Sequence, residues 1–275
     1  MSYATIMVHL DLARSNASLL AFTADLANRM QAGVIGIVAC QPLAVVYGDG
    51  MIMGDYVQQD RDEINAEIET ARTEFHDVLT SRVSDLQWRS TMTIGALCDY
   101  AAEQARSADI ILVSVGAGTP PTSSRRFVTG DLIMRAGRPV LLVPDGVDAL
   151  GLNRMIVAWK DTREARRAVT DALPLLKLAA EVIVVEIASS DEFAGAEAHC
   201  HDLVGWLHRH RVKAAAMPML SSGNDAATLR SFADDQKADL IVAGGYGHSR
   251  LREWVLGGVT RDFLLHADRC SLISH

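Results

Sequence analysis

Apolar and polar residues along this chain form blocks that predict strands and helices in alternation. Short, nearly uninterrupted apolar runs are separated by longer segments in which apolar residues recur every three or four positions, the spacing of amphipathic helices. Strands that are apolar throughout are typical of parallel sheets covered by helices on both faces. With right-handed crossovers, the pattern predicts an α/β fold with doubly wound parallel sheets. The expected strands cover residues 6–11, 34–39, 87–93, 108–113, 139–143, 156–161, 182–187, 213–220, 238–243 and 270–273.

The same plan occurs twice. The apolar run that ends in Asp11 has a counterpart that ends in Asp161, and residues 108–113 match residues 238–243. Long helices are expected at 58–83 and 192–211, with Ser15 and Thr162 as N-caps of the helices that follow the first strand of each copy. We therefore expect two domains, 1–146 and 151–275, each with a five-stranded parallel sheet. Pairing of the two final strands would protect both exposed sheet edges.

Composition and charge narrow the function classes. The chain has 275 residues, of which 49% are apolar and 22% are charged, values typical of a globular protein. The net charge is −8, and acidic and basic residues are interspersed along the chain. Both features argue against nucleic acid and anionic membrane as partners. No run approaches the length of a membrane span, and residues 1–11 lack the pattern of a signal peptide. Cys40, Cys98, Cys200 and Cys270 show no paired spacing, so reduced thiols in the cytoplasm are expected.

A glycine-rich loop follows the strand that ends at Ala243. It contains Gly244 and Gly247, and Gly257 and Gly258 follow further on. Such glycines allow backbone turns that direct several N–H groups at a phosphate. The alternative is that they only form turns and a helix cap. The loop is neither a Walker A sequence nor the GxGxxG fingerprint.

The spacing Gly244-x2-Gly247-x9-Gly257 resembles the signature of ATP-binding universal stress proteins, and the element order resembles that family twice over essentially the whole chain. The resemblance, to a tandem universal stress protein, implies a Rossmann-like fold of the adenine nucleotide alpha hydrolase-like type in each domain. It also implies ATP, with or without Mg²⁺, in the second domain, and pairing of the domains within the chain. The implied binding residues are Gly244, Gly247, His248, Gly257, Gly258, Val259, Lys160 and Asp161.

This sequence departs from the family pattern in both halves. Gly258 stands where the signature has Ser or Thr, and Lys160 stands where nucleotide-binding members carry Asp, with Asp161 beside it. The first half keeps Asp11 at that position, but its loop contains Pro120 and Pro121, which remove two N–H donors. We therefore interpret the first site as degenerate.

The sequence gives weaker signals for a metal site or a catalytic site than for nucleotide binding. His199, Cys200, His201, His208 and His210 do not converge as metal ligands on a helix, and we interpret them as part of a solvated helix. Residues 51–53, between two glycines, are either a flap or a cover for the sheet edge. No catalytic constellation is evident, and at most His248 and Glu253 would assist slow ATP hydrolysis.

The leading function hypothesis is a stress-response or signalling protein that binds adenine nucleotide. The alternative is a scaffold of the same fold that binds no nucleotide. The sequence leaves a homodimer open and names no protein partner.

Overall fold

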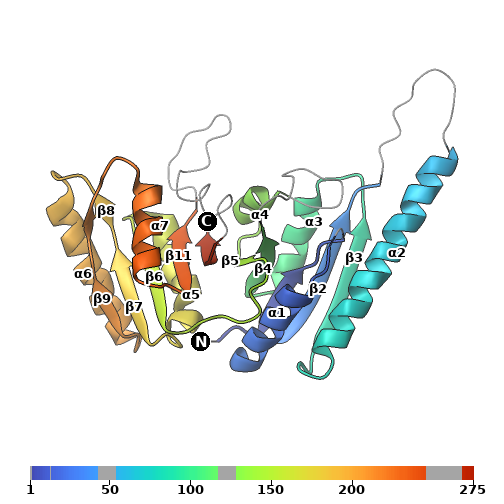
Figure 1. Cartoon of the computed structure of the whole chain (residues 1–275), viewed down its shortest axis with the longest axis horizontal. Coiled ribbons are helices and arrows are strands. Elements are labelled where there is room, and N and C mark those ends of the chain that lie inside the picture. Colours follow the sequence, from blue (N-terminus) through green and yellow to red (C-terminus); the bar gives the residue numbers. More distant parts are fainter. Residues whose placement is uncertain (1, 13, 43–53, 117–127, 246–267) are drawn as a thin grey trace, which may run out of the picture.

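The computed structural model describes residues 2–12, 14–42, 54–116, 128–245 and 268–275. Its main feature is one ten-stranded sheet with the order β3-β2-β1-β4-β5-β12-β11-β6-β7-β9 (Figure 1). A separate two-stranded sheet pairs β8 with β10. The strands are β1 Thr5–His9, β2 Gly33–Cys40, β3 Leu86–Met92, β4 Ile110–Val115, β5 Val140–Pro144, β6 Arg154–Ala158, β7 Glu181–Val185, β8 Ile187–Ala188, β9 Ala214–Ala216, β10 Met219–Leu220, β11 Leu240–Gly244 and β12 Cys270–Ser274.

Each half of the large sheet is parallel, and the halves meet through the antiparallel pair β5–β12. The predicted α/β class, five strands per half and edge pairing are confirmed, but the two expected sheets form one continuous sheet. Leu141 lies beside Leu112 in β4, and Leu272 lies beside Val242 at the matching place in β11. Because Leu141 and Leu272 also pair with each other, a local two-fold axis passes between them.

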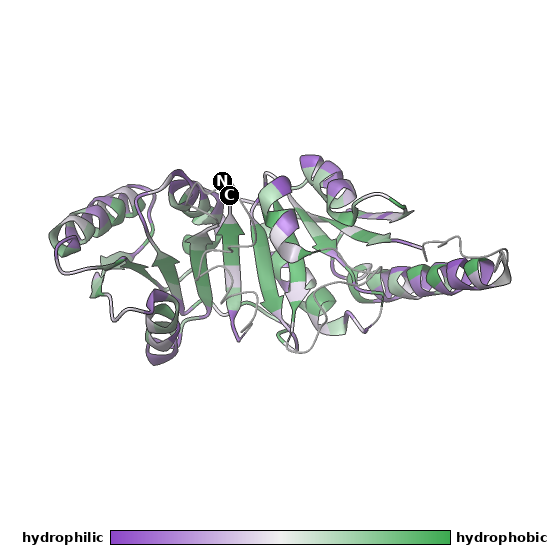
Figure 2. Ribbon diagram, turned by 90° about the horizontal axis from the view of Figure 1, so that it is seen from above, coloured by the Kyte–Doolittle hydropathy of each residue, from purple (hydrophilic) through white to green (hydrophobic). Residues whose placement is uncertain are grey.

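Helices cover both faces of the sheet. Leu20 of α1, Ile64 of α2 and Leu173 of α5 belong to a single core on one face. On the opposite face, Leu132 of α4 and Phe232 of α7 belong to two smaller cores, one in each half. Figure 2 shows the apolar strands enclosed by helices whose outer surfaces are hydrophilic. The helices are α1 Ala17–Met30, α2 Gly54–Leu79, α3 Leu97–Gln104, α4 Thr129–Arg135, α5 Arg163–Leu176, α6 Phe193–Arg209 and α7 Asp225–Asp235, with a 3-10 turn at Ala105–Ser107.

Two predicted strands are each divided in the structure. The run 182–187 becomes β7 and β8, separated at Glu186, and the run 213–220 becomes β9 and β10, separated before Met219. Pro218 lies in the second gap and has no N–H for a sheet. The chain therefore leaves the large sheet there, and the short continuation of each strand pairs in the small sheet instead.

The starts of α1 and α5 test two predicted caps. Thr162 is the N-cap of α5, and its side chain accepts a hydrogen bond from the Ala165 N–H, as predicted. In α1 the N-cap is Asn16, so the prediction of Ser15 is wrong by one residue. The Ser15 hydroxyl donates to Glu74 of α2 at 2.7 Å, and its oxygen accepts from the N–H of Ala17, the first residue of α1, at 3.2 Å.

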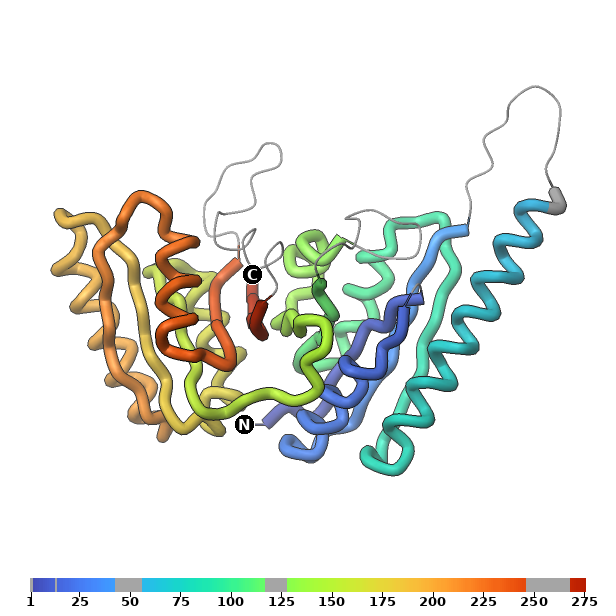
Figure 3. Tube along the Cα trace, in the orientation of Figure 1, coloured from blue at the N-terminus to red at the C-terminus, as the bar shows by residue number. Residues whose placement is uncertain are grey.

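Two hydrogen bonds join the halves beside the strand pair. The Tyr3 hydroxyl donates to the Asp171 carbonyl of α5 at 2.7 Å, and Arg167 donates to the Gly137 carbonyl at 2.5 Å. A Cβ on Gly245 would lie 3.3 Å from Ile133 Cγ2 of the first half, so this glycine permits close packing beside the junction. Figure 3 shows the link from β5 to β6 passing between the halves. Among the described residues, no helix is long and apolar enough to cross a bilayer.

Candidate functional site

The strand order defines two crevices. Ligands of open parallel sheets bind at the carboxyl ends of strands where the winding direction reverses. In the first half that reversal lies between β1 and β4, and in the second half it lies between β6 and β11. Asp11 follows β1, while Lys160 follows β6 and Gly244 ends β11. The predicted site residues that the structure describes therefore lie around the second crevice.

Arg14 bridges the first crevice. Its Nε donates to Asp11 Oδ2 at 2.7 Å, and its Nη1 donates to the Asp145 carboxylate at 2.6 Å. Ser114 of β4 also donates to Asp145, at 2.7 Å. Although burial lowers the pKa of Arg14, hydrogen bonding to Asp11 and both carboxylate charges give a net rise. One guanidinium thus connects the segments after β1 and β5, and Asp11 and Arg14 also line a cavity of about 830 Å³ beside α2.

The surroundings keep this bridge in place. Asp11 is 3% exposed, and its N–H donates to Asn16 Oδ1 at 2.8 Å. Glu74 of α2 accepts from the Asn16 N–H at 3.1 Å, which fixes the loop between β1 and α1. A Cβ on Gly116 would overlap the Asp145 carboxylate. Gly116 therefore makes room for an internal ion pair.

The second crevice is built differently. α5 begins five residues after β6 ends, whereas α1 begins eight residues after β1 ends. The shorter loop closes on itself, since the Thr162 N–H donates to the Lys160 carbonyl at 2.6 Å. Asp161 forms an ion pair with Arg166 on the next turn, and the Lys160 side chain is exposed. Within the described ranges, no guanidinium of this half joins the segments after β6 and β12 as Arg14 joins those after β1 and β5.

Gly244 has a clear packing role. A Cβ at this position would lie 2.5 Å from the Ala165 nitrogen and 2.7 Å from the Glu164 carbonyl carbon. Both contacts are with backbone, so neither neighbour could rotate away. The glycine lets the end of β11 approach the first turn of α5. Gly247, His248, Gly257, Gly258 and Val259 lie outside the described residues, as do Glu253, Pro120, Pro121 and residues 51–53.

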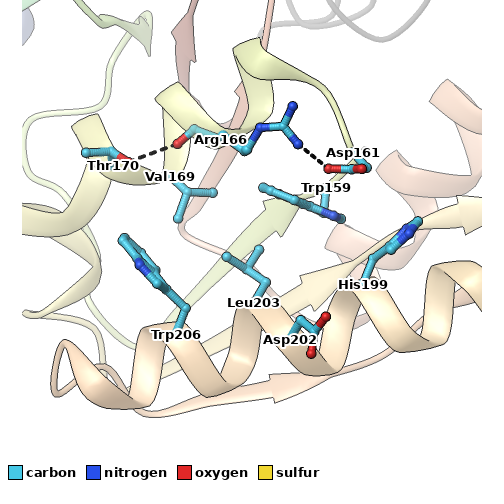
Figure 4. A pocket seen from close by; sticks show the side chains of 9 residues that line it. All are labelled: Trp159, Asp161, Arg166, Val169, Thr170, His199, Asp202, Leu203 and Trp206. Carbon is cyan, nitrogen blue, oxygen red and sulfur yellow. Dashed lines mark hydrogen bonds and ion pairs between the residues drawn. The ribbon is translucent and has the colours of Figure 1, made fainter.

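A cavity that the sequence did not predict lies between α5 and α6. Its volume is about 430 Å³, and its walls carry two indole rings (Figure 4). Trp159 follows β6 directly, and its Nε1 is buried without a hydrogen-bond partner among the described residues. A tryptophan at the end of a switch-point strand was the available signal. The lining residues are Trp159, Asp161, Arg166, Val169, Thr170, His199, Asp202, Leu203 and Trp206.

A buried carboxylate lies beside the cavity. Glu186, which follows β7, is 9% exposed, and its Oε2 lies 3.2 Å from His199 Nδ1. Burial raises the pKa of Glu186, and the nearby His199 opposes that rise. Burial and the charge of Glu186 also raise the pKa of the Cys200 thiol to about 11.

The remaining histidines of α6 have separate surroundings. His201 Nδ1 lies 2.8 Å from the Glu197 carbonyl, and His208 Nε2 lies 2.9 Å from the Ala214 carbonyl. The His210 ring contacts the Trp206 ring in a tilted arrangement, with ring centroids 4.1 Å apart and an interplanar angle of 45°. Among the described residues, no cluster of His, Cys, Asp or Glu could hold a metal ion.

Comparisons with known proteins give matches among solved structures. A universal stress protein from Archaeoglobus fulgidus DSM 4304 superposes with a TM-score of 0.74 at 11% identity, covering 98% of this chain and 95% of the other. A functionally unknown protein from Pseudomonas aeruginosa PAO1 gives 0.57 at 12% identity, covering 99% and 92%. A protein from P. aeruginosa UCBPP-PA14, provisionally described as a universal stress protein, gives 0.57 at 14% identity, covering 99% and 93%.

No protein-family model and no curated protein matches the sequence. At identities of 11% to 14%, the structural matches establish the fold. Over nearly its whole length, the chain therefore has the α/β fold seen in universal stress proteins.

Proposed function

We propose that this protein is a tandem universal stress protein that binds one adenine nucleotide, ATP with or without Mg²⁺, in the half formed by residues 151–275. The observation that carries the proposal is the glycine spacing Gly244-x2-Gly247-x9-Gly257 directly after β11, at the switch point of a fold shared with universal stress proteins. The proposed domains are residues 1–146 and 151–275, and the proposed compartment is the cytoplasm.

The difference between the two crevices supports binding in one half. In the first, the Asp11–Arg14–Asp145 network places two carboxylates and one guanidinium at the carboxyl ends of β1 and β5, and the surplus negative charge disfavours a phosphate. At the second, the first turn of α5 lies against Gly244, and the amide dipoles of a helix N-terminus favour an anion. Lys160 adds a positive charge beside it. A triphosphate has the matching charge, so one nucleotide per chain is expected.

A scaffold that binds no nucleotide is the second candidate. Two observations favour it: the packing role of Gly244, and the departures from the family signature at Lys160 and Gly258. Mass spectrometry of small molecules released from the denatured protein separates the two candidates. Adenine nucleotide should be released, or ATP should titrate calorimetrically with a stoichiometry of one. No nucleotide by either route supports the scaffold, and two equivalent sites contradict the asymmetry.

Gly247→Val tests the loop itself. If the Gly247 backbone faces phosphate in a conformation that favours glycine, the variant adds strain of about 1–3 kcal/mol. ATP affinity should then fall about tenfold or more, while the melting temperature of the ligand-free protein stays within about 2 °C. Calorimetry and thermal melting on the same sample give both values.

Gly223→Ala is the matched control, because Gly223 is a turn glycine with a φ of +96° that lies before α7. It should lower stability by about 1 kcal/mol and leave ATP affinity unchanged. If Gly247→Val behaves like this control, Gly247 is a turn residue and the proposed site is wrong.

A further inference from the structure

The cavity between α5 and α6 has an apolar end and a polar end. Figure 4 shows Val169, Leu203 and Trp206 gathered at one end. At the other end lie Asp202 and His199, and the nitrogen-bearing edge of Trp159 turns toward that side. The volume of about 430 Å³ lies within the range of about 300–1,000 Å³ that is typical of small-molecule sites.

Most polar groups around this cavity already have partners. Asp161 pairs with Arg166, His199 contacts Glu186, and the Thr170 hydroxyl donates to the Arg166 carbonyl at 3.0 Å. Three groups differ: among the described residues, the indole N–H groups of Trp159 and Trp206 and the Asp202 carboxylate have no hydrogen bond or ion pair. Of the two N–H groups, only that of Trp159 is also closed to solvent. The Trp159 N–H and the Asp202 carboxylate are therefore the donor and the anionic acceptor that we consider for a ligand.

These two groups define the chemistry of a ligand. A buried indole N–H without an acceptor loses the hydrogen bond it makes in water, and a ligand oxygen would restore it. The Asp202 carboxylate favours a cationic partner, and the faces of Trp159 and Trp206 also attract cations. The walls of Val169 and Leu203 suit a flat apolar body. An anionic ligand would meet carboxylates at the polar end and be disfavoured.

We propose that the α5–α6 cavity is a binding site for a small arylalkyl amine that carries a hydrogen-bond acceptor close to its ammonium group. The aromatic ring lies between Val169, Leu203 and Trp206. The ammonium group binds Asp202, and the acceptor receives the Trp159 N–H. This site goes beyond the proposed nucleotide function and does not depend on it.

The test uses the full chain and 2-amino-1-phenylethanol as the probe, with binding measured by calorimetry and by tryptophan fluorescence. 2-Phenylethylamine lacks the acceptor hydroxyl, and mandelate replaces the ammonium group with a carboxylate. We expect the probe to bind, 2-phenylethylamine to bind about three- to tenfold more weakly, and mandelate not to bind at matched concentrations. Mandelate binding as tightly as the amine would overturn the proposal, as would the absence of probe binding at millimolar concentration.

Two variants separate a built site from general apolar adsorption. Asp202→Asn removes an exposed charge with no recorded partner, so the fold should survive, and probe affinity should fall about fivefold or more. Glu197→Gln is the matched control, because Glu197 is an exposed carboxylate on α6 that does not line the cavity. The affinity of the Glu197→Gln variant for the probe should equal that of the parent protein.

Trp159→Phe keeps an aromatic ring but removes the N–H. It should abolish the advantage of the hydroxylated amine over 2-phenylethylamine while circular dichroism stays unchanged. Equal behaviour of Asp202→Asn and Glu197→Gln would contradict the proposal. Competitive displacement of the probe by ATP would also contradict it, because the cavity would then belong to the nucleotide site.

Discussion

Arg14 determines what the first crevice offers to a ligand. Its guanidinium lies against Asp11, which is almost fully buried, and against the more exposed Asp145. Neither Arg14 nor Asp145 was among the site residues predicted from the sequence. Three facts could have suggested the network: both acids follow strands, parallel strand ends meet at one edge, and an arginine lies three residues after the first acid.

Arg14→Ala should destabilise the protein by about 1–3 kcal/mol, because the buried Asp11 carboxylate loses a charged partner. Urea unfolding would show a lower midpoint at an unchanged slope. Arg29→Ala is the control, since Arg29 forms a surface pair with Asp25 four residues away, and it should cost no more than about 0.5 kcal/mol. Equal effects of the two variants would mean that the Arg14 bridge contributes no more than a surface pair.

All four cysteines are free thiols, and the structure buries each of them. Burial raises the pKa of Cys200 to about 11 and that of Cys270 to about 12. Because the thiolate is the reactive form, both thiols stay protonated and unreactive from pH 7 to 9. Ellman's reagent should therefore label neither Cys200 nor Cys270 in the native protein at pH 8, and should label both after denaturant is added. Rapid native labelling of Cys200 or Cys270 would show that the cores around them open readily.

At the scale of elements, the close approach of β11 to the backbone of α5 explains why residue 244 is glycine. The sequence had suggested that Gly244 binds a ligand. Gly244→Ala should lower stability by about 1–3 kcal/mol, because the new methyl group overlaps the backbone of α5. Gly205→Ala should instead raise stability by about 0.5–1 kcal/mol, since Gly205 lies within α6 and its nearest atom is a flexible arginine terminus at 3.8 Å. Thermal melting measures the decrease expected for Gly244→Ala and the increase expected for Gly205→Ala. If Gly244→Ala leaves the melting temperature unchanged, Gly244 has no packing role.

The elements that sequence predicted well are those set by local pattern. Apolar runs defined most strands of the large sheet, although β3 contains several polar residues, and Thr162 capped α5 as expected. The predictions that failed depend on neighbours distant in sequence. Ser15 donates a hydrogen bond to Glu74 of α2, and β8 and β10 form strands by pairing with each other. Likewise, no periodicity shows that Trp159 and Trp206 would line one cavity.

At the scale of the molecule, Tyr3 joins the first strand segment to a helix of the other half. Tyr3→Phe removes the hydrogen bond to the Asp171 carbonyl and should cost about 1 kcal/mol. Tyr100→Phe is the control, because the Tyr100 hydroxyl has no recorded hydrogen bond within the described part of the chain, and it should change stability by less than about 0.5 kcal/mol. Denaturant unfolding compares them. An equal effect would show that Tyr3 contributes packing and no cross-half bond.

The junction between β5 and β12 has a consequence for how the two halves could diverge. If the two halves were separate copies of one chain, they would pair through this edge as a symmetric homodimer. Any substitution would then be present in both subunits. A covalent link makes the pairing intramolecular, at an effective concentration that does not depend on how much protein is present. Each half of the chain then always pairs with the other half, whose sequence differs from its own. The link thus permits the two halves to differ: Asp11 and Arg14 line a cavity in one half, while Trp159 and Trp206 line a cavity in the other.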